Sequence, residues 1–208
     1  LSASYSTVVF SLVTAIPDPA FEDKLIALNI DKDGRNGSVL NTSISSLTSL
    51  DVSSSSIKDL TGIKGFTSLT NLNCSGNVLT FLDLSKNTSL TIVNSNNNKL
   101  LSLNLKNGNN INLNLSSNFK NNPDLNCIQV DDEILSTNNW STIKDAVASY
   151  SLDCNVYTLI PDSNFEDKLI ALEIDKDGKN GKVLTSSINK VTSLDLESSN
   201  ITNLKGIE

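Results

Sequence analysis

Two copies of an acidic loop contain the residues of this 208-residue chain that are best suited to chemistry. The loops read DKDGRNG over residues 31–37 and DKDGKNG over residues 175–181, and each follows a segment that we expect to be helical. Asp and Asn oxygens are hard ligands that Ca²⁺ prefers, and the acidic loop of an EF-hand also follows a helix. The sequence therefore makes Ca²⁺ a candidate bound ion, with the candidate ligands Asp31, Asp33, Asn36, Asp175, Asp177 and Asn180.

The acidic loops nevertheless depart from a complete EF-hand. One residue is inserted before Asn36, so the twelfth place of the loop falls on Ser43, or on Ser187 in the second copy. A register that begins at Asn29 puts Leu40 there instead, and neither register supplies the closing bidentate carboxylate. Asp, Asn and Gly are also the residues of tight turns. Two interpretations stay open, a weak cation site and a turn that binds nothing.

Catalysis has little support in this sequence. The chain has no His, which removes the Ser-His-Asp and Cys-His systems and the commonest metal ligand. Adjacent acids such as Asp131, Asp132 and Glu133 do not by themselves define a common site. The net charge of -7 argues against nucleic acids and anionic membranes as partners, and no apolar run is long enough to span a bilayer. We expect a protein that is not an enzyme, requires no cofactor, binds no nucleic acid and inserts into no membrane.

A repeat of 20 to 22 residues indicates the fold. The frame L-x-x-L-x-L-x-x-N matches LTSLDVSSS, LTNLNCSGN, LTIVNSNNN and NINLNLSSN, which begin at residues 47, 69, 90 and 110. This frame and period are the signature of leucine-rich repeats. The sequence predicts a β-rich α/β fold, a right-handed, horseshoe-like leucine-rich repeat solenoid with a helical N-terminal cap and a disulfide-closed C-terminal cap.

The repeat frame assigns a position to each side chain. Two core columns are predicted, one with Leu50, Leu72, Val93 and Leu113 and the other with Val52, Cys74, Ser95 and Leu115. Asn77, Asn98 and Asn118 form a predicted ladder of amides that bond the backbone of neighbouring repeats. The alternate strand positions form an exposed concave face that could bind a protein or a glycan, although it lacks the aromatic residues usual in such sites. Its candidate binding residues are Ser49, Asp51, Asn71, Asn73, Ile92, Asn94, Asn112 and Asn114; alternatively, they only keep an exposed sheet soluble.

Caps are expected at both ends, because a stack of repeats leaves its first and last core layers open. Residues 16–46 form the predicted N-terminal cap, with a helix from Pro17 to Ile30 that Asp18 caps, followed by the acidic loop. Residues 47–126 hold the repeats, and residues 127–156 form the C-terminal cap. A disulfide between Cys127 and Cys154 would close that cap, whereas the alternative is two reduced core cysteines. Cys74 falls in a core column and is predicted to be free.

A duplication covers the start of the chain. The 49 residues from Ile16 recur from Ile160 with 32 identities, so residues 157–208 are interpreted as a second, truncated copy of the cap and first repeat, from a longer parent protein. Residues 1–15 are either a leader, because the segment 13–15 suits a signal-peptide cleavage site, or the tail of a preceding unit.

The ordered series IPDPAFEDKLIALNIDKDG, LDVSSSSIKDLTGI, LNCSGNVLTFLDLSKNTSLT and NPDLNCIQVDD, followed by a late Cys, resembles the secreted leucine-rich repeat proteins of Bacteroidetes and Flavobacteria. The resemblance implies an exported, secreted or cell-surface protein for adhesion or recognition of a protein or glycan, and it names no ligand. One alternative is a structural spacer of tandem units in a large surface adhesin, with a head-to-tail contact through the second cap. Another is an accessory binding module of a secreted polysaccharide-degrading enzyme.

Overall fold

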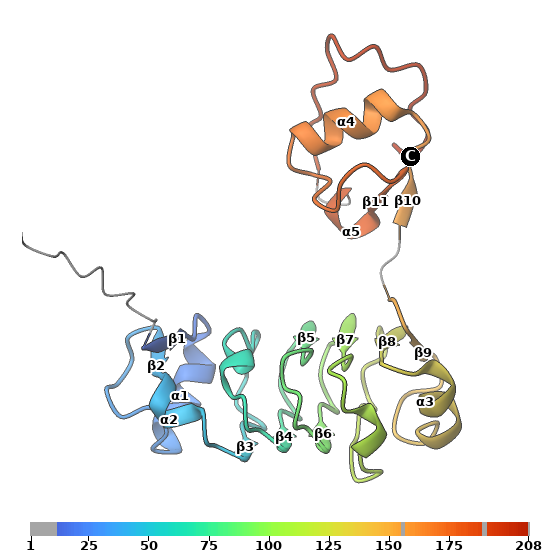
Figure 1. The fold of residues 1–208 in the computed structure, drawn as a ribbon. Helices are drawn as coiled ribbons and strands as arrows, with labels where there is room; N and C mark the ends of the chain where they lie inside the picture. Colours follow the sequence, from blue (N-terminus) through green and yellow to red (C-terminus); the bar gives the residue numbers. More distant parts are fainter. Residues whose placement is uncertain (1–11, 155–156, 189–190, 208) are drawn as a thin grey trace, which may run out of the picture. The chain divides into compact units, whose positions relative to one another are not determined.

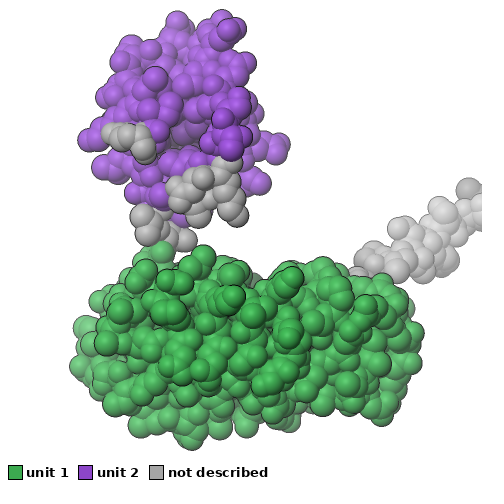
Figure 2. Space-filling view, turned by 180° about the vertical axis from the view of Figure 1, so that it is seen from behind, with its two compact units in different colours: residues 1–154 green, residues 155–208 purple. Residues whose placement is uncertain are grey.

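The computed structural model describes residues 12–154, 157–188 and 191–207, so residues 1–11 of the predicted leader lie outside the described part. The chain divides into two compact units, residues 1–154 and residues 155–208 (Figure 2). Each unit is described by itself below.

The N-terminal cap of the first unit is built on helix α1 (Pro19–Ala27). Asp18 is its N-cap, as predicted, and its Oδ1 accepts hydrogen bonds from the N–H groups of Ala20 and Phe21 at 2.8 and 3.0 Å. Pro19 occupies the first turn, where its missing N–H costs nothing. Phe21 is fully buried and stacks on Phe66 of the first repeat at 6.2 Å between ring centroids. The helix therefore covers the open end of the repeat core, as expected.

A short antiparallel pair completes this cap. Strand β1 (Val13–Ala15) pairs with β2 (Ser38–Leu40), and helix α2 (Asn41–Ile44) follows. The segment proposed as a cleavage site is thus a strand. Gly62 lies against this strand with a φ of 104°, and a Cβ there would come within 2.5 Å of the Ala15 carbonyl oxygen. Only glycine allows this approach.

The first parallel sheet contains one strand from each of three successive repeats (Figure 1). Its strands are β3 (Ser49–Asp51), β4 (Asn71–Asn73) and β6 (Ile92–Asn94), and the register aligns Leu50 with Leu72 and Leu72 with Val93. All three side chains are buried. The predicted core column is confirmed over these repeats.

A second parallel sheet lies on the other side of the repeats. It consists of β5 (Phe81–Asp83), β7 (Ser102–Asn104), β8 (Cys127–Gln129) and β9 (Ser149–Ser151). We call one repeat with its segments on both sides a coil. The connecting segments include the 3₁₀ helix η1 (Ile63–Gly65).

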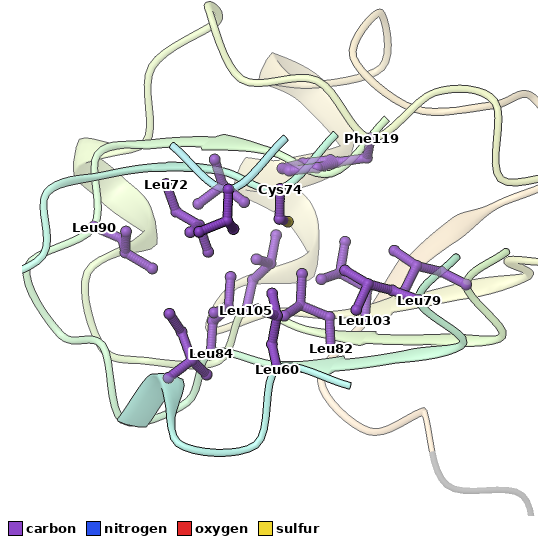
Figure 3. Close-up of a cluster of buried hydrophobic side chains, with 14 of the residues drawn as sticks. Leu60, Leu72, Cys74, Leu79, Leu82, Leu84, Leu90, Leu103, Leu105 and Phe119 are labelled. Atoms are coloured by element: carbon purple, nitrogen blue, oxygen red, sulfur yellow. The ribbon is translucent and has the colours of Figure 1, made fainter. Parts of the chain in front are cut away.

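The core fills the space between the two sheets. Figure 3 shows Leu72 and Cys74, from the coils of the first sheet, facing Leu82 and Leu84, from the side of the second sheet. All four side chains are at most 1% exposed. Burial of such aliphatic side chains contributes about 1.5–3 kcal/mol each. A core of this kind needs few aromatic residues, which agrees with the aromatic content of 5% in this sequence.

The predicted frame of the fourth repeat is wrong. It placed Leu113 and Leu115 in the core and paired Asn94 with Asn114. In the structure Leu115 is 61% exposed, Leu113 is only half-buried, and Asn94 instead pairs with Asn118. The strand positions of this coil therefore lie four residues further along the chain than the sequence pattern indicates.

An insertion in the connecting segment causes this shift. The 3₁₀ helix η2 (Asn110–Asn112) lengthens the coil, and buried Asn110 fixes it by accepting a 2.7 Å hydrogen bond from the Asp131 N–H. Ser117 and Phe119, both buried, then occupy the two core columns. The Val93 N–H donates to Ser117 Oγ, and the Phe119 ring fills the position that Leu115 was expected to fill.

The asparagine ladder is confirmed for Asn77 and Asn98, and its third member is Asn122 instead of Asn118. Each side-chain amide donates to a carbonyl of its own coil and to a carbonyl of the preceding coil. These acceptors are the carbonyls of Cys74 and Val52 for Asn77, Ser95 and Cys74 for Asn98, and Phe119 and Ser95 for Asn122. These bonds satisfy backbone carbonyls that would otherwise be buried without a partner.

The C-terminal cap of the first unit contains helix α3 (Glu133–Asn139) and the predicted disulfide. Cys127 and Cys154 are bonded, with 5.7 Å between their Cα atoms. Cys127 lies on β8, and β9 follows β8 in the sheet. Cys74 is free and buried, and burial raises the pKa of its thiol to about 12.

The second unit repeats the architecture of the N-terminal cap. Helix α4 (Ser163–Ala171) follows strand β10 (Tyr157–Leu159), which pairs with β11 (Lys182–Leu184) ahead of helix α5 (Thr185–Ile188). Its small core is centred on Phe165. Among the described residues of both units, no helix is long and apolar enough to cross a membrane.

Candidate functional site

The exposed side of the first sheet is the main candidate binding surface. We call it the polar strand face and define it as the outward side chains of β3, β4 and β6 together with Asn118. The register aligns Ser49 with Asn71 and Asn71 with Ile92 in one row, and Asp51 with Asn73 and Asn73 with Asn94 in the next. Neighbouring side chains in a row are about 4.8 Å apart, the spacing of paired strands. Six of the eight predicted binding residues are thus brought together.

Hydrogen bonds within the polar strand face orient its side chains. The Asn73 Nδ2 donates to Asp51 Oδ2 at 3.1 Å across the strands. The hydroxyls of Ser53 and Ser75 donate to Asp51 and Asn73 at 2.6 and 2.7 Å, two residues along each chain. The Ser53 hydroxyl and backbone N–H lower the pKa of Asp51, with a smaller contribution from Asn73. Asp51 is therefore an oriented anion in an otherwise uncharged row.

Asn112 and Asn114 do not belong to the polar strand face, which corrects the sequence prediction. Asn112 ends the 3₁₀ helix η2 and donates to Asn109 Oδ1, whereas Asn114 Oδ1 accepts the Ser116 N–H within a turn. The place expected for Asn114 beside Asn94 is occupied by Asn118. The connecting segment of this coil is longer than in the other coils. The sequence analysis did not recognise the longer segment, because NINLNLSSN matches the repeat frame by itself.

The second sheet presents an exposed aromatic ring that the sequence interpretation missed. Phe81 on β5 is 58% exposed and borders a hollow of about 190 Å³ together with Asp59, Asp83, Lys64 and Lys86. LTFLDLSKN, residues 79–87, matches the same repeat frame as the first sheet. Recognition of this second series would have placed Phe81 at an outward position of a strand.

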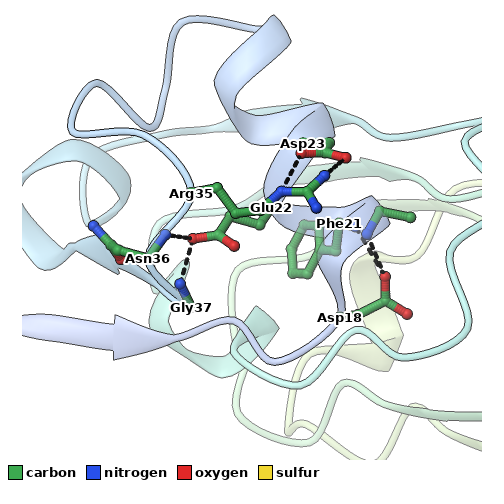
Figure 4. A network of polar contacts seen from close by, with 8 residues as sticks. Asp18, Phe21, Glu22, Asp23, Arg35, Asn36 and Gly37 are labelled. Atoms are coloured by element: carbon green, nitrogen blue, oxygen red, sulfur yellow. Dashed lines mark hydrogen bonds and ion pairs between the residues drawn. The ribbon is translucent and has the colours of Figure 1, made fainter.

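A buried glutamate holds the first acidic loop in place (Figure 4). Glu22 of α1 is only 2% exposed, and its Oε1 accepts hydrogen bonds from the N–H groups of Asn36 and Gly37 at 2.7 and 2.6 Å. The neighbouring Asp23 forms an exposed ion pair with Arg35. The sequence analysis assigned no role to Glu22. Its repetition as Glu166, which makes the same two bonds in the second unit, was the available signal.

The three candidate ligands of the loop have different environments. Asp31 is 2% exposed, and its Oδ2 is buried without a hydrogen-bond partner. Asp33 and Asn36 are exposed, and Asn36 Nδ2 donates to Asp33 Oδ2 at 2.9 Å. Burial raises the pKa of Asp31 to about 6, and the nearby carboxylates of Asp33 and Glu22 also raise it. Within the described residues, no three His, Cys, Asp or Glu side chains are grouped so that they could hold a metal. Any cation here would therefore bind through few carboxylates.

Comparisons with known proteins find partial matches. No family model matches the chain. A stretch of 45 residues, 22% of this chain, is 56% identical to internalin J of Listeria monocytogenes serotype 4b, strain F2365, and spans only 5% of that protein. The solved functional domain of InlJ from Listeria monocytogenes, described as including a cysteine ladder, is 28% identical at a TM-score of 0.43, over 68% of this chain and 28% of that one.

A second solved structure contains the CBM51-2 and INT domains of ZmpB from Clostridium perfringens in complex with GlcNAc. It is 28% identical at a TM-score of 0.37 and covers 49% of this chain and 21% of that one. The segment of high sequence identity is shared with a protein of Listeria, so this match does not support the predicted Bacteroidetes or Flavobacteria type. The chain contains a segment homologous to an internalin, a protein of the leucine-rich repeat type.

Proposed function

We propose that this chain is a non-enzymatic recognition module of an exported, cell-surface protein, and that it binds a protein or a glycan through the polar strand face. The fold we infer for it is a right-handed, horseshoe-like solenoid whose concave side is this face. The parallel register of β3, β4 and β6 supports that inference.

The ordered rows of the polar strand face carry the proposal. Ser49, Asn71 and Asp51 are exposed at neighbouring strand positions, and the hydrogen bond from Asn73 fixes the Asp51 carboxylate. Such an array offers donors and acceptors in fixed positions, so a ligand that bonds to them loses little further side-chain entropy. An array of amides and hydroxyls suits the hydroxyls of a neutral glycan or the backbone of a protein ligand.

Export is supported by the disulfide. Cys127 and Cys154 are paired across the C-terminal cap, and such bonds persist mainly in oxidising compartments outside the cytosol. The segment shared with an internalin agrees with a surface protein, and transfer of that property to this chain is part of the proposal.

Two arginine substitutions test the proposal. Ser49→Arg with Asn71→Arg puts two long cations onto the polar strand face at exposed positions, and Ser149→Arg on β9 is the matched control on the other sheet. Binding of the full chain is measured on an array of neutral glycans and on immobilised extracellular proteins. We expect the double variant to lose at least about tenfold in affinity for any ligand that the unchanged chain binds, while the control retains it.

Two results would contradict the proposal. One is equal binding by the double variant and the control. The other is loss of binding in a Phe81→Ala variant while both arginine variants bind normally, which would move the site to the second sheet.

The duplication favours one alternative function, a structural spacer of tandem units. The cap contacts of Glu22 recur at Glu166, and those of Asp18 recur at Asp162, so the second unit preserves a complete cap. A head-to-tail contact through the second cap belongs to this alternative. A spacer would keep the adhesion of the whole protein when the polar strand face is altered.

A further inference from the structure

The Asp31 carboxyl group is buried with one oxygen unsatisfied. Its Oδ2 has less than 1 Å² of accessible surface and no hydrogen-bond partner. Its Oδ1 accepts only a long bond, 3.4 Å from the Asp33 N–H. Burial of a carboxylate oxygen without a partner is costly, so this arrangement requires a compensating group.

The same arrangement occurs independently in the second unit. Asp175 is 3% exposed, its Oδ2 is again buried without a partner, and its Oδ1 accepts a 3.3 Å bond from the Asp177 N–H. The two loops differ in sequence at Arg35 and Lys179, yet both repeat the unsatisfied oxygen. A feature that recurs in two separate copies of the loop is a property of the motif.

The donors that could satisfy Asp31 bond to other groups. The N–H groups of Asn36 and Gly37 donate to Glu22, and the Asn36 side-chain amide donates to Asp33. Arg35 is engaged by Asp23 on the exposed side of the loop. The loop thus directs its own hydrogen-bond donors away from the buried oxygen and leaves it without a partner from the protein.

We propose that each acidic loop binds one Ca²⁺ ion, with Asp31 Oδ2 and the Asp33 carboxylate as protein ligands in the first unit and with Asp175 and Asp177 in the second. Ca²⁺ accepts six to eight oxygen ligands in flexible geometry, so water and backbone carbonyls complete the shell. Mg²⁺ demands a near-ideal octahedron and fits such a loop less well. With two carboxylates per site, we expect a dissociation constant on the order of 10⁻⁴–10⁻³ M, as in extracellular calcium modules.

Calorimetric and thermal titration of the full chain with CaCl₂ at pH 7 tests this proposal. We expect two ions per chain, one after Asp31→Asn, and none after Asp31→Asn is combined with Asp175→Asn. The melting temperature of the unchanged chain should rise by roughly 3–6 °C when calcium is tenfold above its dissociation constant, with a smaller rise in MgCl₂. Asp124→Asn is the matched control, because this carboxylate is exposed and lies outside both acidic loops and the polar strand face, and the variant should still bind two ions.

Asp33→Asn is a second variant that replaces Asp31→Asn in the test if the latter does not fold. Asp33 is exposed, so its replacement leaves the core intact. This variant should also bind one ion. Absence of both heat and a melting shift would overturn the proposal, and would mean that a proton satisfies Asp31. Retention of two ions by Asp31→Asn or Asp33→Asn would overturn it as well, since the ions would then bind elsewhere.

Discussion

The asparagine ladder makes a prediction that separates the sequence frame from the structure. The frame assigns the third ladder position to Asn118, whereas the structure assigns it to Asn122, which is fully buried. Replacement of Asn122 by Ala removes the bond that its Oδ1 accepts from the Leu100 N–H at 3.1 Å. It also removes the bonds that its Nδ2 donates to the carbonyls of Ser95, Phe119 and Lys120 at 3.1, 2.9 and 3.4 Å.

The expected magnitude follows from the two groups that are left without a partner, the Leu100 N–H and the Phe119 carbonyl. The Ser95 carbonyl keeps its bond from the Asn98 side chain. A buried polar group left without a partner costs about 1–3 kcal/mol, so Asn122→Ala should lower the free energy of unfolding by about 2–6 kcal/mol. Asn118 is half-buried, and its side chain accepts one bond, from the Lys120 N–H at 3.0 Å. Asn118→Ala should therefore cost only about 0.5–1.5 kcal/mol.

Urea unfolding followed by the fluorescence of Trp140 measures both variants. Trp140 is the only tryptophan and is buried in the C-terminal cap of the same unit, so it reports on that unit alone. A protein of this size is typically stable by about 5–15 kcal/mol, so the two predicted losses are well separated. Equal losses, or a larger loss for Asn118→Ala, would refute the assigned register of the fourth coil.

Three further predictions concern stability. Reduction of the Cys127–Cys154 bond, with its sequence separation of 27, should cost about 3–4 kcal/mol by the chain-entropy model, and an unchanged melting temperature under reductant would argue against that cost. Ser95→Ala should raise the free energy of unfolding by about 1 kcal/mol, because the buried Ser95 Oγ has no hydrogen-bond partner; a measured loss in urea would contradict this. The Thr202 hydroxyl and backbone N–H groups lower the pKa of Asp162, so their stabilising bonds persist above its ordinary pKa of 3.8 and weaken as the pH falls toward the lowered value. The Thr202 amide NMR signal should therefore stay constant as the pH falls through 3.8, and a titration shift centred on 3.8 would contradict the lowered pKa.

Much of the fold could be predicted, because local signals and tertiary packing agree in most of the chain. Asp18 and Pro19 satisfy helix-start rules, and the tertiary contact of Phe21 with Phe66 reinforces the same helix. Leu50 and Leu72 are spaced by one repeat and face the core in register. Each of these features depends on periodicity or capping, which a single sequence displays directly.

The fourth coil could not be predicted, because a long-range contact overrides its pattern. NINLNLSSN matches the repeat frame, but Asn110 bonds with Asp131, two residues after β8, and the segment forms a 3₁₀ helix. That partner is 21 residues away and nothing in the local sequence marks it. The Glu22 contacts were missed for the same reason, since its donors lie 14 and 15 residues further along the chain.

The candidate site was predicted in part. Asn71 and Asn73 occupy their expected positions because the first three repeats keep a regular period. Asn112 and Asn114 were misplaced by the shifted frame. Phe81 was missed because the four matches to the repeat frame did not include the second series of strands, to which β5 belongs.

Adhesion of cells that display the complete protein is the most direct test of the central claim, that the polar strand face recognises a ligand. Ser49→Arg with Asn71→Arg should reduce adhesion at least about tenfold, while Ser149→Arg leaves it unchanged. All three substitutions are at exposed positions, so circular dichroism should show the same folded state in each variant. Unchanged adhesion of the double variant, with the fold intact, would contradict the claim and favour the spacer.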